Sequence, residues 1–150
     1  MLEQTGDLFS DELSCDARCV TTNGVLDRSD CLVMGAGVAL AAKQKFPSLP
    51  RIWGDEVRKH GGPVLSVTVF PGIPYAIVSF PTKYHWRDPS STELIAKSAR
   101  LLVKATDAHG WKRILLPRPG CLNGGLAWPD VQEILSPILD DRFTVINLEV

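Results

Sequence analysis

The sequence alternates short apolar runs with longer amphipathic segments, and this alternation limits the possible folds more than any other feature. Runs such as "YAIVSF" and "RILLP" are almost continuously apolar, which is typical of strands that are buried on both faces of a sheet. Strands that alternate with helices predict an α/β domain with a mixed, largely parallel sheet covered by helices on both faces. In such sheets, ligands bind beyond the carboxyl ends of the strands.

The boundaries of these elements follow from local sequence signals. Strands are expected at 18–23, 64–70, 75–80, 113–117 and 143–148, with a further short strand at 3–5, and helices at 37–46, 48–62, 90–110 and 128–141. "FPGIPYA" has the Pro/Gly content of a hairpin between two of the strands. Ser90 and Glu93 have the spacing of a capping box, and Gly110 suits the end of the same helix.

Composition restricts the class of protein. A chain of 150 residues is expected to form one domain, 1–150. The net charge of -1 gives no basic field for strong nonspecific binding of nucleic acid. No apolar run is long enough to span a membrane, and the N-terminus lacks the layout of a signal peptide, so a cytoplasmic monomer is expected. The four cysteines and the scattered histidines lack zinc spacing, so we expect reduced thiols, no metal and no cofactor.

Two glycine-rich segments each lead into a predicted helix. In "NGVLDRSDCLVMGAGVAL", Gly35 and Gly37 lie at the start of the helix at 37–46, but Leu40 occupies the third glycine position of a dinucleotide-binding fingerprint. A Walker A loop is excluded because no Gly-Lys-Ser/Thr follows. Taken alone, this segment fits a plain glycine-rich turn as well as a ligand loop.

The second segment, "LLPRPGCLNGGLAWPDV", runs from a buried strand through glycines into the helix at 128–141. No Lys or Arg follows Arg118 within the loop, so backbone amides would have to hold any phosphate. Two such loops at one edge of a sheet fit a diphosphate that links two sugars. Together they favour a nucleotide diphosphate ligand over two plain turns.

The order and spacing of several motifs resemble the macro domain family, which binds ADP-ribose. These motifs are "GDLF" at 6–9, "TTNG" at 21–24, "VMGAGVALAAKQKFP" at 33–47 and "PRPGCLNGGLAW" at 117–128. "FPTKYHWRDPSS" at 80–91 is similar to a segment of the DNA ADP-ribosylglycohydrolase antitoxins, which are relatives of the terminal ADP-ribose protein glycohydrolases. The resemblance implies a single three-layer α/β/α sandwich that removes ADP-ribose from a modified protein or DNA.

The resemblance also implies a role for individual residues. Asp7 and the backbone at Leu8 would contact adenine, and Asn23 would contact the distal ribose. Lys83 would be the catalytic lysine. The two glycine-rich segments would surround the distal ribose and the diphosphate through Gly35, Ala36, Gly37 and Val38, and through Gly120, Cys121, Leu122, Asn123, Gly124, Gly125 and Leu126.

The proposed role of Lys83 agrees with the chemistry of glycosidic bonds, whose cleavage passes through an electron-poor anomeric carbon. A deprotonated lysine amine can attack such a carbon. Without the resemblance, a lysine that extends to solvent beside Trp86 is the simpler interpretation.

One departure from the family pattern leaves the function open. The protein-specific branch has an aspartate where this chain has Gly124, and Ala127 replaces the acidic residue that the antitoxins place before tryptophan. Lys83 would then act alone, act with Asp27 or Asp30 of the inserted "LDRSD", or not act. The alternatives are a non-catalytic reader of ADP-ribosylated targets and a phosphatase acting on ADP-ribose 1″-phosphate.

Overall fold

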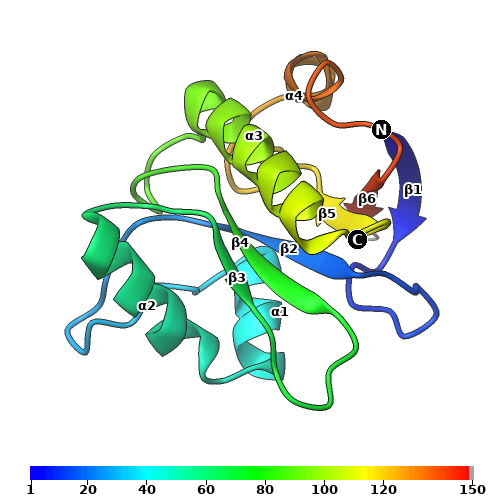
Figure 1. Cartoon of the computed structure of the whole chain (residues 1–150). Coiled ribbons are helices and arrows are strands. Elements are labelled where there is room, and N and C mark those ends of the chain that lie inside the picture. Colours follow the sequence, from blue (N-terminus) through cyan, green and yellow to red (C-terminus); the bar gives the residue numbers. More distant parts are fainter. Residues whose placement is uncertain (149–150) are drawn as a thin grey trace.

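Six strands form one mixed sheet in the order β1-β6-β5-β2-β4-β3 (Figure 1). The computed structural model describes residues 1–148. The strands are β1 (Leu2–Gly6), β2 (Ala17–Thr22), β3 (Ser66–Thr68), β4 (Ala76–Pro81), β5 (Ile114–Pro117) and β6 (Phe143–Leu148). Only β3 runs antiparallel to its neighbour β4; all the other neighbours are parallel.

Four helices cover the two faces of the sheet, which confirms the predicted three-layer α/β/α arrangement (Figure 1). They are α1 (Gly37–Lys45), α2 (Leu49–His60), α3 (Thr92–His109) and α4 (Trp128–Leu135). Helices α3 and α4 pack on one face, and α1 and α2 pack on the other. Within residues 1–148, no helix combines the length and the apolar character that a bilayer crossing requires.

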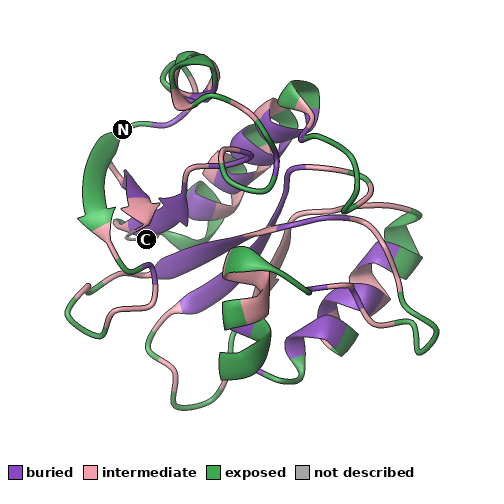
Figure 2. Cartoon of the chain, turned by 180° about the vertical axis from the view of Figure 1, so that it is seen from behind, coloured by how far each residue is buried: buried purple, intermediate pink, exposed green. Residues whose placement is uncertain are grey.

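The alternation of side chains along each strand divides the core between these layers. Ala17 and Cys19 of β2 belong to the cluster under α3 and α4, whereas Val20 belongs to the cluster under α1 and α2. In β4, Val78 likewise belongs to the cluster under α3 and α4, and Ile77 belongs to the cluster under α1 and α2. Because a strand turns successive side chains to opposite faces, continuous apolar runs bury both faces of the central strands (Figure 2).

Two expectations about helix ends were wrong. The N-cap of α3 is Ser91, whose hydroxyl accepts a hydrogen bond from the Leu94 amide at 3.2 Å. The predicted capping box does not form, because the cap lies one residue beyond Ser90 and Leu94 occupies the position expected for Glu93. Helix α4 ends at Leu135 and not near residue 141, since the ring of Pro137 prevents the helical pattern from continuing. The predicted C-cap at Gly110 is confirmed.

A buried arginine holds the segment between β1 and β2 against the sheet. Arg18 on β2 is only 3% exposed. Its guanidinium donates to the carbonyls of Leu8 at 2.9 Å, Ser10 at 3.1 Å and Leu13 at 2.7 Å. It also stacks 4.3 Å from the ring centroid of Tyr75. One side chain of the central sheet therefore contacts the segment 7–16 at three of its carbonyls.

Candidate functional site

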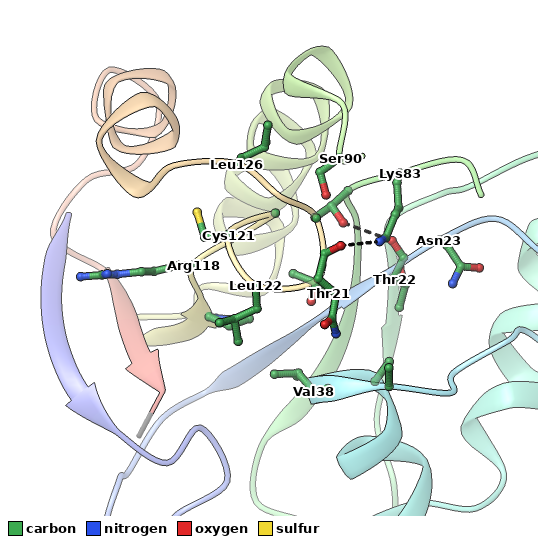
Figure 3. Close-up of a pocket in the computed structure, with 18 of the residues that line it drawn as sticks. Thr21, Thr22, Asn23, Val38, Lys83, Ser90, Arg118, Cys121, Leu122 and Leu126 are labelled. Carbon is green, nitrogen blue, oxygen red and sulfur yellow. Dashed lines mark hydrogen bonds between the residues drawn. The ribbon is translucent and has the colours of Figure 1, made fainter. Parts of the chain in front are cut away.

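A cavity of about 680 Å³ opens at the carboxyl ends of the parallel strands (Figure 3). Its lining combines the ends of β2, β4, β5 and β6 with both glycine-rich segments. The lining residues are Thr21, Thr22, Asn23, Val33, Gly35, Ala36, Gly37, Val38, Ala39, Thr82, Lys83, Trp86, Ser90, Pro117, Arg118, Gly120, Cys121, Leu122, Asn123, Gly124, Leu126, Ala127, Trp128, Ile146, Asn147 and Leu148. Sites for small ligands and cofactors have this range of size.

The first glycine-rich segment directs the start of α1 toward the cavity. Ala36 is the N-cap, and no side chain caps the helix. The first amides of a helix have no partner inside the helix, and the helix dipole favours an anion there. The predicted residues Gly35, Ala36, Gly37 and Val38 all line the cavity. This end of α1 is therefore suited to hold a phosphate.

The second glycine-rich segment bends sharply at Gly120 and Gly125, whose φ angles are 75° and 74°. Within the segment, Cys121, Gly125 and Leu126 donate to loop carbonyls. Among the described residues, the amides from Leu122 to Gly124 donate to nothing, so they are free to bind an anion. Of the predicted residues in this segment, all except Gly125 line the cavity.

The two segments face each other across the cavity. A Cβ added to Gly37 would lie 3.0 Å from the side-chain nitrogen of Asn123. Gly37 also has a φ of 56°, which glycine adopts without strain. Free amides of one segment and the open helix start of the other thus surround the same space.

Lys83 follows β4 and extends toward the second segment (Figure 3). Its Nζ donates to the carbonyl of Trp86 at 3.3 Å and to the carbonyl of Asn123 at 3.4 Å. The side chain is half-buried and lines the cavity. Lys83 is therefore placed in the cavity beside the second glycine-rich segment.

The charged side chains that residues 1–148 contribute to the lining are all positive. Among the described residues it contains no Asp or Glu, and its charged side chains are Lys83 and Arg118. Arg118 stacks 4.9 Å from the ring centroid of Trp128 and lies 3.9 Å from Glu3. Sequence reasoning treated Arg118 only as the start of the loop, although its place one residue after β5 is a signal that strand-end rules can find.

Ser90 occupies the space where a side chain at position 124 would begin. A Cβ added to Gly124 would collide with the Ser90 hydroxyl and would lie 2.6 Å from the Gly120 carbonyl oxygen. The Ser90 hydroxyl is buried and has no hydrogen-bond partner within residues 1–148. The Ser90 amide donates to the Gly124 carbonyl at 3.0 Å. The packing around Gly124 therefore leaves no room for an aspartate at this position.

The remaining predicted residues are placed as follows. Asn23 lines the cavity, but its side chain also joins the ends of its own loop by accepting from the Val25 amide at 2.9 Å and donating to the Val33 carbonyl at 3.1 Å. Asp7 and Leu8 lie outside the lining. The side chain of Leu8 packs in a cluster that includes Val38 and Leu148, both of which do line the cavity.

The inserted acids do not reach the site. Asp27 accepts hydrogen bonds from the amides of Ser29 and Cys31 in an exposed turn. Asp30 pairs with Arg58 of α2 at 3.2 Å. Neither residue lines the cavity. The suggestion that Asp27 or Asp30 assists Lys83 is therefore not supported by the geometry.

Cys121 lines the cavity, but its thiol is poorly suited to act as a nucleophile. Burial raises the pKa of Cys121, and the positive charge of Arg118 only partly opposes this effect. The thiol therefore stays protonated near neutral pH, whereas the thiolate is the reactive form. We expect Cys121→Ser to retain any hydrolytic activity of the site within about three-fold, a difference of roughly 0.6 kcal/mol. Rates of the variant and of the original chain on one substrate would check this, and a loss of a hundred-fold would contradict it.

Comparisons with known proteins agree with this geometry. The sequence model of the macro domain family matches residues 28–135. A DNA ADP-ribosyl glycohydrolase of Thermus aquaticus is 34% identical over 112 residues, which are 72% of this chain and 31% of that protein. A protein of the same name from Mycobacterium tuberculosis is 31% identical over 76% of this chain and 34% of its own length. The chain thus spans about a third of each of these relatives.

Solved structures extend the likeness to the fold. The macrodomain of Thermus aquaticus DarG has a TM-score of 0.81 and 30% identity over 99% of this chain and 97% of its own. A structure described as Thermosipho africanus DarTG in complex with ADP-ribose has the same fold, with a TM-score of 0.81 and 23% identity over 98% of this chain and 42% of that one. By its sequence, its fold and the glycine-rich segments around its cavity, the chain belongs to the macro domain family.

Proposed function

We propose that this macro domain binds ADP-ribose and removes it hydrolytically from modified DNA. The observation that carries the proposal is the position of Lys83, which lines the cavity and whose Nζ lies 3.4 Å from the Asn123 carbonyl oxygen of the second glycine-rich segment. The name of the relatives, DNA ADP-ribosyl glycohydrolase, supports DNA as the macromolecule, at 34% identity for the protein of Thermus aquaticus.

In this proposal each part of ADP-ribose has its own part of the site. The diphosphate binds the open start of α1 and the free amides from Leu122 to Gly124. The distal ribose lies beside Gly35 and Asn23, with its anomeric carbon toward Lys83. Adenine lies toward the end of β6, where Leu8 packs beneath Leu148 and Asp7 follows β1.

The proposed reaction needs one nucleophile and one water molecule. The Lys83 amine, as the free base, attacks the anomeric carbon C1″, and the bond from C1″ to the DNA breaks with its electron pair going to the DNA. The DNA group takes up the proton that Nζ loses once its bond to C1″ has formed. The ribose ring of this adduct opens, so that Nζ and C1″ are joined as a Schiff base. Water then adds to C1″ and cleaves the bond to Nζ, which restores the lysine and releases ADP-ribose. The sum is one substrate plus one water giving ADP-ribose and unmodified DNA.

Three substrates tested in parallel separate the candidate functions. They are ADP-ribosylated DNA, protein modified on aspartate or glutamate, and ADP-ribose 1″-phosphate. We expect release of ADP-ribose from the DNA alone, measured as free ADP-ribose by chromatography. Release from protein alone would contradict DNA as the substrate, and release of phosphate from the third substrate would indicate a phosphatase.

A non-catalytic reader is the second candidate, because the lining formed by residues 1–148 lacks the carboxylate that assists the lysine in the protein-specific branch. Binding of ADP-ribose without release from any of the three substrates would establish it.

Binding of free ADP-ribose is a separate expected result. We expect a dissociation constant in the micromolar range, about -8 kcal/mol, and a higher melting temperature in the presence of the ligand. AMP should bind more weakly, because it lacks the second phosphate and the distal ribose that span both segments. Calorimetry and thermal shift measurements check this, and no response at millimolar ADP-ribose would contradict it.

A further inference from the structure

The segment 83–88 exposes large side chains beside the cavity. Tyr84 is 61% exposed and Trp86 is 47% exposed. Leu122, which lines the cavity together with Trp86, is 67% exposed. Leu2 and Val69 are the other exposed large apolar side chains within residues 1–148, so three of the five belong to this region. Single exposed apolar residues are common, but a group of them beside a cavity marks a binding surface.

Hydrogen bonds fix the shape of this segment. Its carbonyl at Tyr84 accepts from the Gly24 amide at 3.0 Å, which ties it to the first glycine-rich segment. The Trp86 carbonyl accepts from Lys83 at 3.3 Å. Inside the segment, the amides of Arg87 and Asp88 donate to His85, at 3.1 Å to the ring and 3.0 Å to the carbonyl. The exposed rings are therefore presented on an ordered backbone that holds Lys83 as well.

The chemistry of the exposed groups favours nucleic acid. The Arg87 guanidinium lies 4.7 Å from the centroid of the Trp86 ring, and the His85 ring lies 5.1 Å from it. Within residues 1–148, no ring or cation stacks on Tyr84, and its side chain is 61% exposed, so its ring is accessible to a base. Open aromatic faces with a nearby arginine bind unpaired bases and their phosphates with little sequence preference.

We infer that Tyr84, Trp86 and Arg87 form a stacking surface for the nucleotides that flank the modified nucleotide in single-stranded DNA. The inference rests on the proposed function, because Lys83 at the anomeric carbon places the DNA next to residues 84–87. The modified base must leave the base stack before its bond to the ribose of ADP-ribose can reach Lys83. Only neighbouring bases that are not paired with a second strand can then stack on Tyr84. Arg87 pairs with a phosphate of the strand.

The test compares two substrates that share the same ADP-ribosylated base. One is a single-stranded oligonucleotide, and the other is the modified nucleoside alone. We expect Tyr84→Ala to lower kcat/KM for the oligonucleotide by about 5-fold to 100-fold, which is the effect of losing one base stack. The kcat/KM for the nucleoside should change by less than about two-fold. Arg87→Gln should also lower kcat/KM for the oligonucleotide, and it should make that kcat/KM depend less on the salt concentration. Val69→Ala is the matched control, since Val69 is 68% exposed but follows Thr68, which pairs with Ile77 near the start of β4, whereas segment 83–88 follows the other end of that strand.

Affinity measured without turnover makes the test independent of catalysis. In a Lys83→Ala background, fluorescence anisotropy should show weaker binding of the modified oligonucleotide when Tyr84→Ala is added, and weaker binding of a modified duplex than of a single strand. The stacking surface would be overturned if Tyr84→Ala lowered kcat/KM equally for the oligonucleotide and the nucleoside. It would also be overturned if Tyr84→Ala did not weaken binding of the modified oligonucleotide. If the original chain releases ADP-ribose from neither substrate, the proposed function fails, and the anisotropy result alone decides the inference.

Discussion

Lys83→Ala is expected to lower single-turnover release of ADP-ribose from modified DNA by at least about a hundred-fold, while ADP-ribose affinity stays within about ten-fold. The lysine meets the anomeric carbon strongly only as the bond breaks, whereas the diphosphate contacts exist before and after cleavage. Lys83→Arg is the matched variant, because it keeps the positive charge but removes the nucleophilic amine. It should be nearly as slow as Lys83→Ala.

Covalent trapping separates a nucleophile from a positioning cation. Borohydride added during turnover should attach ADP-ribose to the original chain and leave Lys83→Ala unlabelled, which mass spectrometry of the intact protein measures. If Lys83→Arg released ADP-ribose at the original rate and no adduct formed, Lys83 would act through its charge alone. If Lys83→Ala were as fast as the original chain, the proposed mechanism would be wrong.

Gly124→Asp should not restore the missing carboxylate, and we expect it to lower ADP-ribose affinity more than about a hundred-fold. The new Cβ would meet the Ser90 hydroxyl, and the Gly120 carbonyl oxygen and Cα lie 2.6 Å and 2.8 Å away. The Gly120 atoms are backbone, so the loop must move to make room, and the free amides beside Gly124 move with it. Calorimetry with ADP-ribose measures the loss, and circular dichroism checks that the variant is folded.

A matched control uses the same substitution where space is open. Gly62→Asp follows α2, and a Cβ there meets nothing within 4 Å. We expect that variant to bind ADP-ribose like the original chain. A second comparison removes the serine. Ser90→Gly combined with Gly124→Asp should remain defective, because the Gly120 contacts persist. Normal binding by Gly124→Asp alone would show that the second glycine-rich segment does not hold the ligand.

The layers of the fold were predictable because strand and helix periods are local properties of the sequence. Strand β6 has its predicted bounds of 143–148, and α3 ends at the predicted cap, Gly110. The error at the start of α3 arose because Ser90 and Ser91 are both good caps. Only the packing decides between them: Ser90 turns under the second glycine-rich segment and leaves Ser91 to cap the helix.

The site was partly predictable for a different reason. Residues in the glycine-rich segments were found because their motifs are continuous in sequence. Arg118 and Asn147 line the cavity from two strand ends and have no motif of their own, so only the sheet order brings them together. Local sequence patterns also could not predict which partner a side chain contacts. Asp27 accepts hydrogen bonds within its own turn, and Asp30 forms an ion pair with Arg58, although both residues are close to the site in sequence.

The way Arg18 binds segment 7–16 has a consequence for local stability. One guanidinium donates to the carbonyls of Leu8, Ser10 and Leu13, so displacing this side chain releases all three carbonyls at once. We therefore expect the segment to open as one unit when Arg18 is displaced. Its opening would uncover Leu8 while β2 and its neighbours remain paired. Amide hydrogen exchange in this segment would then report one shared opening free energy, below that of global unfolding.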